Sequence, residues 1–117
     1  MLRVMCKSKI HGATVTETAL EYAGSITIPA DLIAAANLVP DERVQVVNLS
    51  NGSRIETYVI EGPAGSGNIC LNGPAARTAY VGDRVHILSF AMMDEEEARA
   101  SKMKVVHVDE SNQLTGE

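Results

Sequence analysis

The chain has 117 residues, of which 45% are apolar and 3% aromatic, so it is long enough for a single domain (residues 1–117) with an aliphatic core. Its 10 basic and 15 acidic residues leave a net charge of -5, which argues against a nucleic-acid partner because such affinity comes largely from neutralising phosphates. No stretch resembles a signal peptide or a membrane span, and Cys6 and Cys70 lack a metal-ligand spacing, so we expect a cytoplasmic protein with reduced thiols and no membrane partner.

Hydrophobic alternation and turn residues predict a chain made mostly of short strands. The predicted strands are residues 2–10, 13–20, 25–28, 44–49, 53–60, 69–71, 84–91 and 105–108. The predicted short helices are residues 29–36, 74–79 and 94–100.

Single residues mark several of the boundaries. Asn37 is typical of a left-handed helix stop, and Asp94 of an N-cap. Asn51-Gly52 predicts a hairpin turn, because both residues tolerate positive φ. The polar residues 109–117 predict a loose tail.

A weak internal repeat relates two segments. Residues 35–46 resemble residues 76–87, since each contains a short helix, a valine, an acidic turn and an Arg-Val pair that enters a strand. One such unit is common in any protein. Two copies at similar spacing in a strand-rich chain favour a pseudo-symmetric barrel, whose interlocked halves remove exposed sheet edges.

The dipeptide Gly24-Ser25 carries potential chemistry, because a serine hydroxyl stands beside the carbonyl of a residue without a side chain. Attack of the hydroxyl on that carbonyl gives an ester, and elimination of the ester splits the chain into residues 1–24 and 25–117. The dehydroalanine left at position 25 then hydrolyses to a pyruvoyl group. Alone, Gly-Ser is a common turn pair, so this reading depends on the rest of the chain.

Several blocks follow one another in a characteristic order. They are Lys9-Ile-His11, Tyr22-Ala-Gly-Ser25, Asn48 with Asn51-Gly52, Thr57-Tyr58, Asn72-Gly73, Val81-Gly82-Asp83, and Ser89-Phe90 before Asp94-Glu-Glu-Glu-Ala98. With these blocks the chain resembles the pyruvoyl-dependent aspartate 1-decarboxylases over nearly its full length.

This resemblance implies an all-β, double-psi β-barrel with short helices that forms a homotetramer with sites between subunits. It implies decarboxylation of L-aspartate to β-alanine and CO2 for pantothenate and coenzyme A synthesis. The chain would be a proenzyme that cleaves itself between Gly24 and Ser25 into a β chain (residues 1–24) and an α chain (residues 25–117). The covalent pyruvoyl cofactor would derive from Ser25. Whether a maturation factor assists the cleavage stays open.

The resemblance also implies roles for single residues. Ser25 would carry the pyruvoyl group that forms a Schiff base with the substrate, Tyr58 would donate a proton, and Thr57 would lie near the cleaved bond. Because aspartate carries two carboxylates, Arg54 and Lys9 are the candidate cations. Strand alternation puts Arg54 and Tyr58 on one face, about 13 Å apart at Cα, and Thr57 on the other. Thr57 and Tyr58 would then share a site only through a bulge or a neighbouring subunit.

A second block matches a segment that holds substrate through its backbone amides. Here it reads Gly73-Pro74-Ala75, whereas the family often has Gly-Ala-Ala, so Pro74 removes one donor. Asn72 is expected to orient the loop near the cleavage bond, and Tyr22 and His11 are weaker supporting candidates.

No metal site is expected, because His11, His86 and His107 are far apart in the sequence and have no ligand spacing. Three other readings stay open: a non-enzymatic barrel module of transcription regulators, a pyruvoyl enzyme for another amino acid, and an uncleaved, inactive precursor. The acidic balance argues against the first, and Arg54 and Lys9 favour a diacid substrate over the second.

Overall fold

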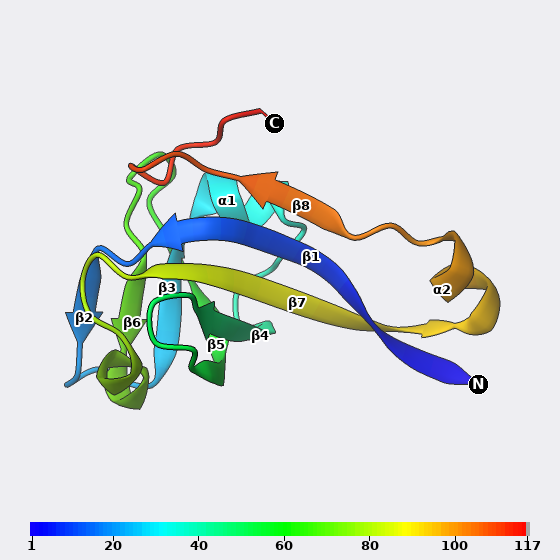
Figure 1. The fold of residues 1–117 in the computed structure, drawn as a ribbon, viewed down its shortest axis with the longest axis horizontal. Helices are drawn as coiled ribbons and strands as arrows, with labels where there is room; N and C mark the ends of the chain where they lie inside the picture. The colour runs from blue at the N-terminus through cyan, green and yellow to red at the C-terminus, as the bar shows by residue number, and fades with distance from the viewer. Residues whose placement is uncertain (117) are drawn as a thin grey trace.

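The computed structural model describes residues 1–116 and consists mainly of strands (Figure 1). The strands are β1 (Leu2–Thr14), β2 (Glu17–Ala19), β3 (Ser25–Pro29), β4 (Arg43–Asn48), β5 (Arg54–Gly62), β6 (Cys70–Asn72), β7 (Arg84–Asp94) and β8 (Lys104–His107). The helices are α1 (Ala30–Ala35), the 3-10 helix η1 (Gly73–Thr78) and α2 (Glu95–Ala100). The predicted all-β class with short helices is confirmed.

The sheet closes on itself. Its strand order is β2-β6-β3-β5-β4-β7-β1-β8, and β2 follows β1 after only Val15 and Thr16. A sheet that begins at β2 therefore returns to the same stretch of chain at β1 and forms a barrel, with β8 added in parallel to the outside of β1. Aliphatic side chains from its strands, such as Ile26, Val46 and Ile87, fill the core. The double-psi β-barrel expected from the sequence is the fold of this chain.

The internal repeat corresponds to a local two-fold relation between strands. β4 and β7 pair antiparallel with Val46 directly opposite Ile87, and these are the last residues of the two repeated segments. β3 and β6 also pair antiparallel, and each has a parallel neighbour, β5 for β3 and β2 for β6. The pseudo-symmetric barrel predicted from the repeat is therefore confirmed.

Several predicted boundaries were wrong by a few residues. β1 runs through a register shift between Ile10 and Ala13 and ends at Thr14, so the second predicted strand shrinks to β2. At the hairpin, Gly52 has positive φ (78°) but Asn51 does not, because a longer turn closes on the Gly52 N–H to Asn48 carbonyl bond.

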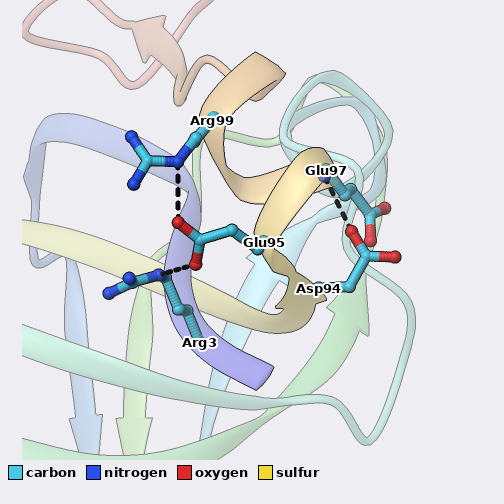
Figure 2. A network of polar contacts seen from close by, with 5 residues as sticks. All are labelled: Arg3, Asp94, Glu95, Glu97 and Arg99. Atoms are coloured by element: carbon cyan, nitrogen blue, oxygen red, sulfur yellow. Dashed lines mark hydrogen bonds and ion pairs between the residues drawn. The ribbon is translucent and has the colours of Figure 1, made fainter. Parts of the chain in front are cut away.

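Two predicted helix signals are confirmed, and one of them is part of a polar network. Asn37 ends α1 with a φ of 55°, and the Asp94 carboxylate accepts a hydrogen bond of 2.8 Å from the Glu97 N–H as the cap of α2. Glu95 receives the Nε–H groups of Arg3 and Arg99, each at 2.7 Å (Figure 2). The exposed Arg3–Glu95 pair joins α2 to the start of β1, whereas the Arg99–Glu95 pair lies within α2.

The prediction of a loose tail was wrong for residues 109–116, and Glu117 lies outside the described residues. Asn112 is buried with a φ of 60°. Its side chain accepts from the Thr14 N–H and donates to the carbonyls of Thr14 and Gly67, each at 2.8 Å. The tail closes over the end of β1 because one buried amide satisfies three backbone groups there.

We expect Asn112→Ala to lower the free energy of unfolding by about 2–4 kcal/mol, because three buried backbone groups lose their partner. Urea unfolding of both proteins measures the difference. The control is Glu110→Ala in the same tail, where the side chain is exposed and a change within about 0.5 kcal/mol is expected. Equal effects of the two substitutions would contradict a structural role for Asn112.

Candidate active site

Two cavities lie on either side of the Gly24–Ser25 peptide bond. Ser25 lines a cavity of about 380 Å³, together with residues of β2, β3, β5 and β6 and with Tyr22 and Ala23. Gly24 lines a second cavity of about 430 Å³, together with Ile55, Glu56, Thr57, Tyr58, Pro74, Ala75 and Thr78. The two residues of the bond therefore line different cavities, which we call the hydroxyl-side cavity (lined by Ser25) and the carbonyl-side cavity (lined by Gly24).

Strand alternation builds the hydroxyl-side cavity. Ser25 pairs with Asn72 and Thr27 with Cys70 across the antiparallel β3–β6 ladder. These four side chains share one face, because residues two apart on a strand point the same way. The residues between them, such as Ile26, point into the core and are fully buried. One face of this ladder is thus a polar cluster and the other is barrel core.

Asn72 holds the Ser25 hydroxyl. Its Nδ2 donates to Ser25 Oγ at 2.9 Å and to Thr27 Oγ1 at 3.0 Å, and the Ser25 hydroxyl faces the Ala23 carbonyl at 3.4 Å. Ser25 has no exposed surface in the chain. A buried serine whose oxygen receives a fixed donor, next to a glycine carbonyl, is held in one position.

The carbonyl-side cavity contains both Thr57 and Tyr58, and neither a bulge nor a second subunit is needed to bring them there. β5 pairs with β4 through Tyr58, and its pairing with β3 starts only at Val59. The edge of β5 before Val59 is therefore free on the side of Gly24. Four consecutive residues of this edge, Ile55 to Tyr58, line the cavity, so residues from both faces of the strand contribute to it.

Gly73 allows the segment before the Gly24–Ser25 bond to pack closely. It has a φ of 63°, and a Cβ there would lie 2.5 Å from the Tyr22 carbonyl oxygen and 2.7 Å from the Gly24 nitrogen. At Gly24 the backbone is not left-handed, and an added Cβ would meet Pro74 Cδ at an ordinary 3.5 Å. In this structure the strict need for glycine thus falls on Gly73.

Of the other expected site residues, only Tyr22 lines one of these two cavities in the single chain. Arg54 is exposed and its Nη1 donates to Gln45 Oε1 at 2.7 Å. Lys9 and His11 lie on β1, and neither lines the cavities beside Gly24 and Ser25. Tyr22 does line the hydroxyl-side cavity, with an exposed side chain.

His11, His86 and His107, which are far apart in the sequence, form one cluster. The ring of His11 lies 4.2 Å from that of His86 and 5.5 Å from that of His107, measured between centroids. The register shift in β1 brings them together: Gly12 has a φ of 72°, and its N–H donates to His86 Nδ1 at 3.0 Å. Since Nδ1 accepts this bond, His86 must be unprotonated there.

The surroundings of the cluster disfavour protonation. Desolvation lowers the pKa of His11 and of His86 most, and the charges of Lys9 and Arg84 and of a neighbouring histidine lower both further. A folded pKa below the unfolded value of about 6.5 means that the unfolded chain binds more protons in the window below 6.5. Stability is therefore full above that pH and falls as the pH drops through it toward the folded pKa.

We expect the urea midpoint to fall between about pH 8 and pH 5.5, before most carboxylates titrate. In His11→Gln the fall should be smaller for two reasons. The lowered pKa of His11 no longer contributes, and the pKa of His86 is no longer lowered by the charge of His11. Unfolding curves at several pH values measure both. An identical pH dependence in the two proteins would exclude the cluster as its source.

Among residues 1–116, no group of three His, Cys, Asp or Glu side chains is arranged to hold a metal ion. In the same part of the chain, no helix has the length and apolar character needed to cross a bilayer.

Thr27 and Cys70 were missed by the sequence analysis. Both belong to the polar face of the β3–β6 ladder that carries Ser25 and Asn72. The alternation Ser-Ile-Thr-Ile at residues 25–28 and Cys-Leu-Asn at residues 70–72 was a usable signal. It did not reveal that the two strands are partners, which depends on barrel closure.

Comparison with known proteins covers nearly the whole chain. A family model described as "Aspartate decarboxylase" matches residues 1–115. The chain is 55% identical over 112 residues to the aspartate 1-decarboxylase of Thermoanaerobacter pseudethanolicus, with 96% of each chain covered. It is 58% identical over 114 residues to that of Pelotomaculum thermopropionicum, with 97% of this chain and 86% of the relative covered. The crystal structure of the rationally designed mkDPBB_sym_86 protein matches 66% of this chain and 90% of its own, with a TM-score of 0.48 and 16% identity.

Proposed function

Because the chain belongs to the aspartate decarboxylase family, we propose that it decarboxylates L-aspartate to β-alanine and CO2 with a pyruvoyl group made from its own Ser25. β-Alanine of this origin supplies pantothenate and coenzyme A synthesis. The observation that carries the proposal is the Ser25 hydroxyl, which is buried and hydrogen-bonded beside Gly24.

The first reaction is cleavage of the chain. Ser25 Oγ attacks the Gly24 carbonyl carbon and the C–N bond breaks, which gives an ester and a free amine at residue 25. Loss of the α-proton of residue 25 then breaks the bond between its Cβ and Oγ. Residues 1–24 leave with Oγ as part of their carboxylate, and residue 25 becomes dehydroalanine. Addition of water and loss of ammonia leave the pyruvoyl ketone.

The residues beside the bond support this sequence of steps. Asn72 donates to Ser25 Oγ and so keeps the attacking atom in place. Thr57 lines the cavity on the Gly24 side, where a hydroxyl donor can stabilise the negative charge that develops on the carbonyl oxygen. Because these two side chains approach from different cavities, each can act on its own atom of the reacting group.

The pyruvoyl group supplies an electron sink for the bond to the departing carboxylate. Tyr58 lines the same cavity as Gly24 and is the proposed donor of the proton that replaces CO2 on the α-carbon. Ala75 and Gly73 are proposed to offer backbone N–H groups to the substrate, while Pro74 offers none.

We place Arg54 and Lys9 as the cations for the two substrate carboxylates, with at least one of them coming from a neighbouring subunit. Neither side chain lines a cavity beside Gly24 and Ser25 in one chain. A homotetramer with sites between subunits, which the family resemblance implies, would supply the missing charges. A cytoplasmic location also stays a prediction.

The intact mass of the purified protein tests the proposal. We expect two species, residues 1–24 and residues 25–117 with a pyruvoyl-blocked N-terminus. Turnover assays with L-aspartate, L-glutamate and uncharged amino acids then test the substrate. A single full-length mass that persists after warm incubation would exclude self-processing, and turnover of another amino acid in place of aspartate would exclude the substrate.

For Tyr58→Phe we expect normal chain cleavage but a fall of at least about 100-fold in β-alanine formation, because proton transfer by a positioned acid contributes that much. Intact mass and β-alanine production measure the two effects separately. Tyr80→Phe, on an exposed loop, is the matched control and should leave both unchanged. Wild-type turnover by Tyr58→Phe would remove Tyr58 as the donor.

A further inference from the structure

Both N–H groups and the carbonyl oxygen of the Asn72 side chain have hydrogen-bond partners. Its two N–H groups go to the hydroxyl oxygens of Ser25 and Thr27. Its Oδ1 accepts from the thiol of Cys70, with Sγ 3.2 Å away. All four residues are on the same face of the β3–β6 ladder, and Cys70 is almost fully buried beside the cavity.

The thiol distinguishes the two orientations of this amide. A hydroxyl both donates and accepts, so Ser25 and Thr27 could pair with either end of the Asn72 side chain. If the amide were rotated by half a turn, Oδ1 would face the two hydroxyls and the NH2 group would face only sulfur, a weak acceptor. One buried N–H would then lack a partner, which is unfavourable. The orientation that directs Nδ2 to Ser25 is therefore the one in which every polar group has a partner, and the Cys70 thiol is the donor that completes it at Oδ1.

Cys70 is suited to donate because it keeps its proton. Burial raises the pKa of the Cys70 thiol most, and the charge of the Glu17 carboxylate and its hydrogen bond with the thiol raise it further. Glu17 pairs with Cys70 across β2 and β6. The group at position 70 is thus a neutral S–H at physiological pH, not a thiolate. Its sulfur lies 3.2 Å from Asn72 Oδ1, within hydrogen-bond distance for donation to that oxygen.

We propose that Cys70 is a positioning residue for the self-cleavage at Gly24–Ser25, which acts by fixing the Asn72 amide so that Nδ2 donates to the attacking Ser25 oxygen. The proposal rests on the self-processing described above. Without the donor, Oδ1 loses its hydrogen bond and the Asn72 side chain is restrained less firmly. Nδ2 then holds Ser25 Oγ less precisely, and attack becomes slower.

The test is the rate of cleavage of freshly synthesised precursor, followed by intact mass. In Cys70→Ala and in Cys70→Val, which fills the space without a donor, we expect cleavage to be about three- to tenfold slower, the range for one lost hydrogen bond. Cys70→Ser keeps a donor and should cleave at close to the wild-type rate. Cys6→Ala is the matched control, since the Cys6 thiol faces the Ser8 carbonyl on β1, and it should cleave normally.

A double-mutant cycle separates positioning from a general effect on packing. If Cys70 acts through Asn72, Cys70→Ala should slow cleavage in the wild-type background but cause no further loss in an Asn72→Ala background. Wild-type rates in both donor-free variants, a Cys70→Ser variant as slow as Cys70→Ala, or additive losses in the cycle would each overturn the proposal. Wild-type precursor that never cleaves would instead refute the proposed function, and this inference with it.

Discussion

Ser25→Ala should remain a single intact chain and should release no CO2 from aspartate above the background of the assay. The substitution removes the oxygen that attacks the Gly24 carbonyl, and with it the atom from which the ester and then the pyruvoyl group arise. Both cleavage and decarboxylation depend on this one atom, so the loss should be complete. Intact mass and CO2 release measure the two activities independently.

The variant should still fold. Ser25 is buried, and its loss leaves one N–H of Asn72 without its acceptor and the Ala23 carbonyl without a long hydrogen bond, at a cost of about 1–3 kcal/mol. A near-normal urea midpoint would show that the loss of activity is chemical. Ser50→Ala, on an exposed turn, is the control and should cleave normally. If Ser25→Ala released CO2 from aspartate, the mechanism would be wrong.

Gly73→Ala should slow cleavage by about 100-fold or more, although residue 73 takes no part in the chemistry. An added Cβ would lie 2.5 Å from the Tyr22 carbonyl oxygen and 2.8 Å from Gly24 Cα, both backbone atoms that cannot rotate away. The segment before Ser25 must therefore shift. A shift of about 1 Å in the reacting carbonyl relative to the hydroxyl can cost two orders of magnitude in rate.

The control for Gly73→Ala is Gly52→Ala, which separates displacement from backbone strain. Gly52 also has positive φ (78°), but no heavy atom lies within 4 Å of its added Cβ. Both variants carry the strain of a left-handed alanine, about 1–2 kcal/mol, yet only Gly73→Ala meets the cleavage segment. A time course of intact mass compares them. Normal cleavage in Gly73→Ala, or equal slowing in the two, would contradict the packing role of Gly73.

The two cavities suggest how one site can serve two reactions. The hydroxyl-side cavity contains the groups that hold Ser25, whereas the carbonyl-side cavity contains Thr57 and Tyr58. Ser25→Ala should disable both reactions, Gly73→Ala should act first on cleavage, and Tyr58→Phe should act on decarboxylation alone. The pattern across the three variants is a stronger test than any one of them.

Much of the local structure was predictable from neighbouring residues. The stop at Asn37 and the cap at Asp94 were correct because each depends on interactions within one turn of chain. The internal repeat predicted a pseudo-symmetric barrel, and Val46 does face Ile87. The blocks around Gly24-Ser25 indicated the family, whose model matches residues 1–115.

The errors came from contacts between distant segments. The tail was expected to be loose because residues 109–117 are polar, but Asn112 satisfies backbone groups of Thr14 and Gly67. The three histidines have no useful spacing, yet a register shift on β1 brings their rings together. Neither result is encoded in local composition.

By itself, the sequence determined most of the strands and turns and indicated the barrel symmetry and the Gly24-Ser25 dipeptide, since these follow from periodicity and short-range chemistry. Only the tertiary structure decided that Gly24 and Ser25 line different cavities, that Thr57 and Tyr58 share one of them, and that Gly73, rather than Gly24, is the glycine on which the segment before Ser25 packs. The physical reason is that strand register and barrel closure set distances between residues that are remote in the chain, and those distances are what the chemistry requires.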